Sequence, residues 1–203
     1  MRIGLLGGTF DPIHNGHLSM ADEARLKFNL DEIWFIPSGN SYQKSNTTDS
    51  NIRAELVEAA IVDIPWAKMS SIEIDRGGPS YTAETLAELK RLYPDNEYFL
   101  IVGADAFKQI AISWHSPQYI FDNCTIIVAY RSDLISTELT NSIVVDYIWH
   151  WNAKVLEMPF YSPLSSTWVR EKINTDSSYF FDVRYPVYKI IKENNLYKEN
   201  KNG

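Results

Sequence analysis

The chain has 203 residues, 45% of them hydrophobic, which is enough for one domain with a substantial core and short for two. Its formal net charge is −7 and its basic residues are scattered, which argues against a general surface for nucleic acid. A single cysteine, no signal-like N-terminus and no long uncharged apolar run lead us to expect a cytoplasmic protein that does not bind membranes.

Apolar runs alternate with helical patterns along the chain. The predicted strands are 2–7, 32–37, 69–74, 98–103, 125–130 and 153–158, and the predicted helices are 16–28, 51–63, 82–93, 167–174 and 186–194. Several strand runs are apolar at nearly every position, which is typical of strands covered on both faces. The alternation predicts right-handed crossovers and a mostly parallel sheet in an α/β fold, while segment 133–151 fits neither pattern.

Residues 7–17, Gly-Gly-Thr-Phe-Asp-Pro-Ile-His-Asn-Gly-His, join the first predicted strand to the first predicted helix. Ligands bind at such crossings because backbone N–H groups and the helix N-terminus point into the crevice. His14 and His17 are three residues apart and so share one helix face, where two imidazoles suit a polyphosphate. One alternative is a capping or core histidine beside a surface histidine. Another is a zinc site, for which four histidines and one cysteine supply few ligands.

The fourth predicted helix begins beside three hydroxyl residues, Ser165, Ser166 and Thr167, with Arg170 about one turn inside it. Ordinary N-capping explains one or two of these hydroxyls. Backbone amides, hydroxyls and a guanidinium would together also hold a triphosphate at the helix N-terminus.

Two further loops are candidates for binding the rest of a nucleotide. Residues 77–82, Gly-Gly-Pro-Ser-Tyr-Thr, enter a helix whose first N–H groups suit a small carboxylate or amide. Asp105 follows the fourth predicted strand. At this position its side chain either contacts a ribose or serves only as the N-cap of a helix. Trp114, further along, is either a core residue or a stacking face for a ring.

Together these residues resemble the bacterial nicotinate-mononucleotide adenylyltransferases, a family of the H-x-G-H nucleotidyltransferase superfamily. The superfamily signature is the run His-Asn-Gly-His at 14–17. The likeness covers nearly the whole chain. It also includes Gly-Pro-Ser-Tyr-Thr at 78–82, Gly-Ala-Asp at 103–105 with Trp114, Ser-Ser-Thr-x-Val-Arg at 165–170, and a closing Leu196-Tyr197.

The resemblance implies a Rossmann-like, doubly wound sheet with helices on both faces. It implies one nucleotidyltransferase domain over 1–203, with a C-terminal helical part at about 166–197. It implies transfer of AMP from ATP to nicotinate mononucleotide, with Mg²⁺ carried on the ATP phosphates and no protein metal site. The catalytic residues would be His14, His17 and Arg170. ATP would be bound by Gly8, Thr9, Phe10, Gly103, Asp105, Ser166 and Thr167, and the mononucleotide by Lys44, Tyr81, Thr82 and Trp114.

One loop departs from the family pattern. Where the family often has Pro-Pro-His-Lys after the second strand, residues 41–44 are Ser-Tyr-Gln-Lys, which keeps Lys44 and loses both prolines. Alternatives that stay open are the same chemistry on nicotinamide mononucleotide or phosphopantetheine, or a nucleotide-binding module without turnover. The run Lys-Met-Ser-Ser at 68–71 resembles a tRNA-synthetase signature and is interpreted as a chance match. The oligomeric state is open, a homo-oligomer included.

Overall fold

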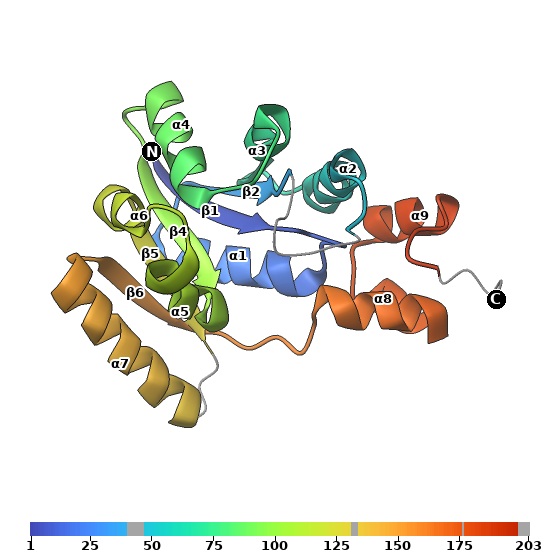
Figure 1. The fold of residues 1–203 in the computed structure, drawn as a ribbon. Helices are drawn as coiled ribbons and strands as arrows, with labels where there is room; N and C mark the ends of the chain where they lie inside the picture. The colour runs from blue at the N-terminus through green and yellow to red at the C-terminus, as the bar shows by residue number, and fades with distance from the viewer. Residues whose placement is uncertain (40–46, 131–133, 176, 199–203) are drawn as a thin grey trace.

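A computed structural model describes residues 1–39, 47–130, 134–175 and 177–198 of the chain. Among these residues, six strands form one sheet: β1 (Arg2–Gly8), β2 (Glu32–Pro37), β3 (Ala67–Met69), β4 (Glu97–Gly103), β5 (Thr125–Tyr130) and β6 (Lys154–Pro159). They lie in the order β3-β2-β1-β4-β5-β6, and every neighbouring pair is parallel (Figure 1). The expected Rossmann-like α/β fold is confirmed.

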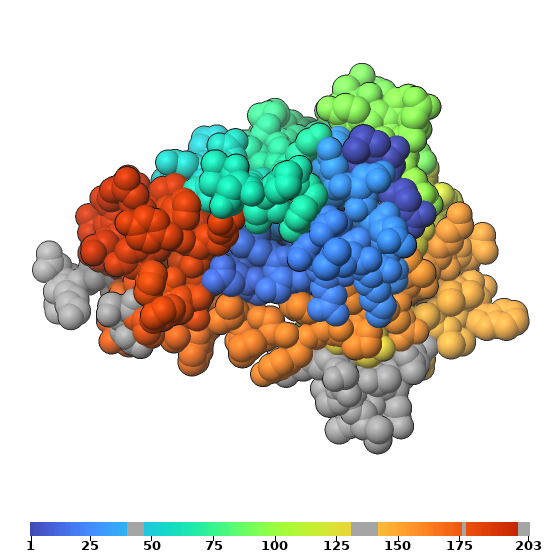
Figure 2. Space-filling model, turned by 180° about the vertical axis from the view of Figure 1, so that it is seen from behind, coloured from blue at the N-terminus to red at the C-terminus, as the bar shows by residue number. Residues whose placement is uncertain are grey.

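Helices cover both faces of the sheet because side chains alternate along the central strands. Leu5 and Leu100 point to one core, and Leu6 and Ile101 point to the other. The first face packs against α3 (Ile72–Arg76), α4 (Thr82–Leu92), α5 (Ala104–Ser113), α6 (Pro117–Asn123) and α7 (Leu134–Trp151). The second face packs against α1 (Asn15–Phe28), α2 (Ser50–Ile61), α8 (Ser166–Thr175), the 3₁₀ helix η1 (Ser177–Phe181) and α9 (Tyr185–Glu193). Figure 2 shows the red C-terminal helices against the cyan and teal segment that holds α2.

The predicted strand 69–74 is wrong beyond its first residue. Strand β3 ends at Met69, and residues 72–76 form the helix α3. The alternation Ile72-Glu73-Ile74 is typical of a half-buried strand, but Glu73 is itself buried and accepts a hydrogen bond from Thr85 of α4 at 2.8 Å. This contact between elements is invisible to a local pattern. The unassigned segment 133–151 holds α7, and neither α7 nor any other described helix is long and apolar enough to cross a membrane.

The topology leaves a crevice at one edge of the sheet. Strand β1 lies between β2 and β4, and the chain leaves β1 through α1 on one face and β4 through α5 on the other. The loops at the carboxyl ends of β1 and β4 therefore diverge, and open α/β sheets bind ligands at this position.

Candidate active site

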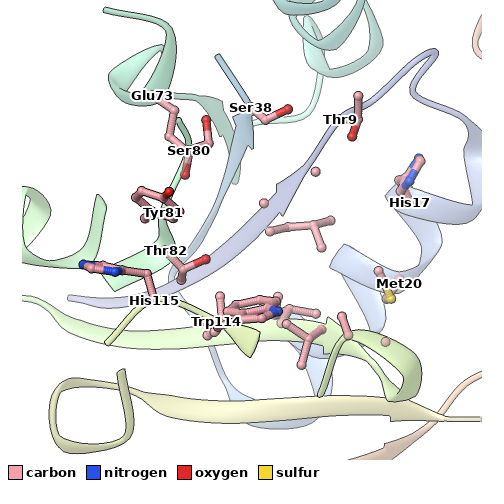
Figure 3. A pocket seen from close by; sticks show the side chains of 18 residues that line it. Thr9, His17, Met20, Ser38, Glu73, Ser80, Tyr81, Thr82, Trp114 and His115 are labelled. Atoms are coloured by element: carbon pink, nitrogen blue, oxygen red, sulfur yellow. The ribbon is translucent and has the colours of Figure 1, made fainter. Parts of the chain in front are cut away.

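A cavity of about 320 Å³ opens at the carboxyl ends of β1 and β4. Its walls come from the end of β1, the residue after β2, the start of α4 and the segment after α5. Residues that line it include Gly8, Thr9, Ser38, Thr82 and Trp114. In Figure 3 the ring of Trp114 lies between the start of α4 and α1, so the cavity presents one flat aromatic face.

A second cavity, of about 920 Å³, lies between the start of α1, the start of α5 and the start of α8. Its lining includes His14, Asp105, Ser166, Thr167 and Arg170. The two cavities adjoin, because His17, Met20, Gly103 and Ala106 line both. His17 is therefore the ionisable side chain that faces both spaces.

The two histidines of the loop are stacked on each other. Their ring centroids are 3.7 Å apart with 28° between the planes, and the ring of Phe10 meets His17 edge-on at 5.0 Å. The backbone N–H of His14 donates to Nδ1 of His17 at 3.2 Å. Because Nδ1 accepts, the neutral ring of His17 carries its proton on Nε2.

Burial keeps His14 neutral at physiological pH. The residue is 6% exposed, and burial lowers its pKa from 6.5 to about 4, against the attraction of the Asp182 carboxylate. Asp182 also fixes the start of α1, because its carbonyl accepts the N–H of Asn15 at 2.8 Å. Its carboxylate pairs with Lys172 at 2.9 Å. His14 therefore brings a polar ring and no positive charge.

The start of α8 is tied to the loop after β1. Arg170 donates from Nη1 to the carbonyl of Asp11 at 2.6 Å and from Nη2 to Oγ1 of Thr167 at 3.2 Å. The hydroxyl of Ser166 donates to the carbonyl of Pro12 at 2.9 Å. The bonds to Asp11 and Pro12 join two motifs that are more than 150 residues apart in the chain, and they bring the guanidinium beside the histidine loop.

The start of α4 forms the opposite wall of the first cavity. The ring of Tyr81 packs against His115 with 4.8 Å between centroids, and Thr82 is the first residue of the helix. The first N–H groups of a helix have no acceptor within it, so they are available to a ligand here. Behind them, burial raises the pKa of Glu73, opposed by hydrogen bonds from Thr85 and Ser80.

The structure brings most of the expected site residues to the two cavities. Gly8, Thr9, Tyr81, Thr82 and Trp114 line the first; His14, Asp105, Ser166, Thr167 and Arg170 line the second; and His17 and Gly103 line both.

Two expected residues differ from this pattern, and a third falls outside the described residues. Phe10 is 2% exposed and packs in the core beneath His17, so its ring does not line either cavity. The side chain of Asp105 points fully into solvent and lies 3.6 Å from Lys108. Lys44 lies outside the described residues, and its phosphate contact stays a prediction.

Residues 5–172 match the family model described as cytidylyltransferase-like. A probable nicotinate-nucleotide adenylyltransferase of Bacillus pumilus is 36% identical over 199 residues, which cover 97% of this chain and 98% of the relative. The chain belongs to the nicotinate-nucleotide adenylyltransferase family. A second relative of the same name, from Clostridium botulinum, is 38% identical over 202 residues and covers 98% of each chain.

A solved structure supports the fold independently. The nicotinic acid mononucleotide adenylyltransferase of Plasmodium falciparum, solved in complex with NaAD, matches with a TM-score of 0.77 over 97% of each chain. At 19% sequence identity, this likeness bears on the fold alone.

Sequence reasoning missed several cavity residues of this family member. They are Met20, Ser38 and Glu73 in the first cavity, and Lys108, Tyr130, Phe160 and Ser162 in the second. Ser38, Phe160 and Ser162 follow the ends of predicted strands, and that position alone could have found them. Glu73 could not be found, because it lies in the segment predicted as strand.

Proposed function

We propose that this protein is a single nucleotidyltransferase domain of the cytoplasm that transfers AMP from MgATP to nicotinate mononucleotide and releases pyrophosphate, a step of NAD biosynthesis. The observation that carries the proposal is the pair of cavities, about 320 and 920 Å³, that adjoin at His17. Two substrates bound side by side would bring their reacting phosphates to this residue. Relatives that are 36% and 38% identical carry the name of this activity.

In the proposed reaction, an oxygen of the mononucleotide 5′-phosphate attacks the α-phosphorus of ATP in line. A new P–O bond forms while the bond to the β-phosphate oxygen breaks, and pyrophosphate leaves with the electron pair. Such transfers depend on positioning and on neutralising charge. Nε2–H of His17 donates to a phosphate oxygen, and Arg170 and the N-terminus of α8 hold the leaving group.

Direct transfer needs no nucleophilic side chain on the protein. Cys124 lies in the core, 7% exposed, and burial raises the pKa of its thiol to about 12. A thiol of that pKa is protonated at neutral pH and is a poor nucleophile. This supports attack by the substrate phosphate itself.

Mg²⁺ enters this proposal as part of the ATP substrate. Among the described residues, no group of three or more histidines, cysteines or carboxylates is arranged to hold a metal ion. Asp105 is among the residues along the second cavity, and its carboxylate is exposed to solvent. Mg²⁺ keeps several waters and binds through phosphates with one or two carboxylates, so the cation would be carried by the triphosphate, where it neutralises charge.

The first cavity suits a pyridine mononucleotide. Trp114 offers a face on which a pyridine ring can stack, and the start of α4 at Thr82 offers N–H donors and a positive dipole to a carboxylate. Phosphopantetheine has no aromatic ring for this face.

The experiment offers MgATP to the purified protein with and without nicotinate mononucleotide. We expect one pyrophosphate for each dinucleotide, and neither product without the acceptor. Binding of ATP without pyrophosphate release would instead indicate a nucleotide-binding module, and formation of ADP would indicate transfer of a different group.

A further inference from the structure

A buried guanidinium lies behind the wall of the first cavity. Arg53, in the first turn of α2, is 1% exposed. It donates from Nη1 to the carbonyl of Thr9 at 2.7 Å and from Nη2 to the carbonyls of Ser38 at 2.6 Å and Gly39 at 3.1 Å. Its Nε donates to the carbonyl of Thr48 at 2.8 Å. One side chain therefore joins the ends of β1 and β2 to the segment that precedes α2.

The residues held by Arg53 are themselves part of the cavity. Thr9 and Ser38 line it, and the N–H of Ser38 also donates to the carbonyl of Gly8 at 2.9 Å. The N–H of Gly39 donates to Oγ of Ser80, another lining residue, at 3.0 Å. In Figure 3, Thr9 and Ser38 lie across the cavity from Trp114. The guanidinium of Arg53 bonds the carbonyls of both and is thus the shared anchor of this side of the cavity.

The packing leaves these residues little freedom to move. A methyl group on Gly39 would lie 2.4 Å from the carbonyl oxygen of Glu73, so the backbone there is already in close contact with α3. Arginine suits this place because its planar fork carries five N–H donors in fixed directions, whereas lysine carries three on one atom. Burial lowers the pKa of Arg53, with Asp11 opposing, yet an arginine in a protein keeps its charge.

We propose that Arg53 is a positioning residue for the transfer reaction: it holds Thr9 and Ser38 in the geometry that receives the acceptor mononucleotide. The proposal rests on the proposed function. Thr9, which the sequence resemblance assigns to ATP, and Ser38 line the first cavity and are not part of the lining of the second, so we assign both to the acceptor. Loss of Arg53 should therefore impair use of the acceptor more than use of ATP, whereas general loosening of the fold would impair both alike.

The test compares Arg53→Ala, Arg53→Lys and a matched control, Arg184→Ala. Arg184 bonds the other end of α2, at Asp63 and at the carbonyl of Ala60, and does not line either cavity. We expect Arg53→Ala to lower kcat/KM for nicotinate mononucleotide about 100-fold, the usual scale for a misplaced site. We expect the KM for ATP to stay within about threefold of wild type, and Arg184→Ala to keep wild-type kinetics with a lower Tm.

Chemical rescue separates positioning from bulk stability. Millimolar guanidinium should raise kcat/KM of Arg53→Ala by at least about tenfold, and the same concentration of methylammonium should not, because only guanidinium restores the planar fork. If Arg53→Ala does not fold, Arg53→Lys decides: we expect at least a tenfold loss of kcat/KM for the acceptor.

Wild-type levels of kcat/KM in either Arg53 variant would overturn the proposal. Equal losses for both substrates, or guanidinium that raises Tm without raising kcat/KM, would also overturn it. A wild-type protein that releases no pyrophosphate would contradict the proposed function instead. In that case the Arg53 proposal is tested by thermal shift with nicotinate mononucleotide, which should stabilise wild type and Arg184→Ala and not Arg53→Ala.

Discussion

A hydrogen bond within the loop at 7–17 determines which ring nitrogen of His17 is the hydrogen-bond donor. Nδ1 accepts the N–H of His14, so Nε2 is the donor. We expect His17→Ala to lower kcat by about 10²–10³, the usual loss for one donor to a transition state, with little change in Tm. His17→Gln places an amide near Nε2 and should retain more activity than His17→Asn, which can only mimic Nδ1. Equal activity of the two amide variants would show that the tautomer does not matter.

Arg170 combines a contact within the protein with a place in the second cavity. Its fork bonds the carbonyl of Asp11 and the hydroxyl of Thr167. Lysine cannot make both bonds and also grip a pyrophosphate. We expect Arg170→Lys to raise the KM for ATP at least about tenfold and to leave the KM for the mononucleotide within about threefold, measured by pyrophosphate release. A larger effect on the mononucleotide would contradict the assignment to the leaving group.

His14 makes the folded protein sensitive to mild acid. Its pKa is about 4 when folded and close to 6.5 when unfolded. Between these values the unfolded chain binds a proton that the folded chain does not, so stability is complete above pH 6.5 and falls as the pH drops toward 4. The contribution is at most about 1.4 kcal/mol per pH unit.

Urea unfolding of wild type and His14→Asn between pH 4.5 and 7 measures this contribution. We expect a flatter dependence in His14→Asn. Identical slopes in the two proteins would show that His14 does not titrate as its burial requires.

Among the secondary-structure elements, the local hydrophobic pattern of the sequence identified the strands that are buried on both faces. Runs such as Ile126-Ile127-Val128 are apolar at every position, and only a covered strand tolerates that. The hydrophobic pattern predicts the wrong element where a contact between elements determines the structure, as for Glu73 in α3. The hydrophobic pattern also did not predict the helix α5, whose first turn follows β4 with no residues between them.

The start of α1 depends on a glycine for reasons of space. A methyl group at Gly16 would lie 2.5 Å from Oγ of Ser162 and 3.0 Å from Nδ1 of His14. We expect Gly16→Ala to lower the free energy of unfolding by about 1–3 kcal/mol and to lower kcat, because the His14 ring must shift. Denaturant unfolding and pyrophosphate release measure the two effects. Adding Ser162→Gly removes the closer contact and should recover part of the stability; no recovery would contradict this account of the clash.

At the scale of the whole molecule, the sheet order explains why distant motifs meet. The loops after β1 and β4, the start of α4 and the start of α8 all face the crevice at the carboxyl edge of the sheet. The motifs could be found in the sequence because each has its own residue signature. Arg53 could not, because a lone arginine in a helix gives no sign that three chain segments will close around it.

The two pyridine mononucleotides differ in the group that their rings carry, a carboxylate or an amide. In the proposed site at the start of α4, nicotinate would present a carboxylate to N–H donors, whereas nicotinamide would turn its own NH₂ toward some of them. Each hydrogen bond left unmade costs about 1–3 kcal/mol, on the order of tenfold to a hundredfold in kcat/KM. We expect Trp114, which lines this cavity, to stack on the ring of either acceptor, so Trp114→Ala should weaken binding of both and largely preserve their ratio.

The reaction and its acceptor preference are tested together by incubating the protein with MgATP and an equimolar mixture of nicotinate mononucleotide, nicotinamide mononucleotide and phosphopantetheine, and identifying the products by mass. We expect nicotinate adenine dinucleotide as the main product, in at least about tenfold excess over the nicotinamide dinucleotide. Equal amounts of the two dinucleotides would contradict the preference for nicotinate. An adenylylated phosphopantetheine as main product, or no adenylylated product, would contradict the function itself.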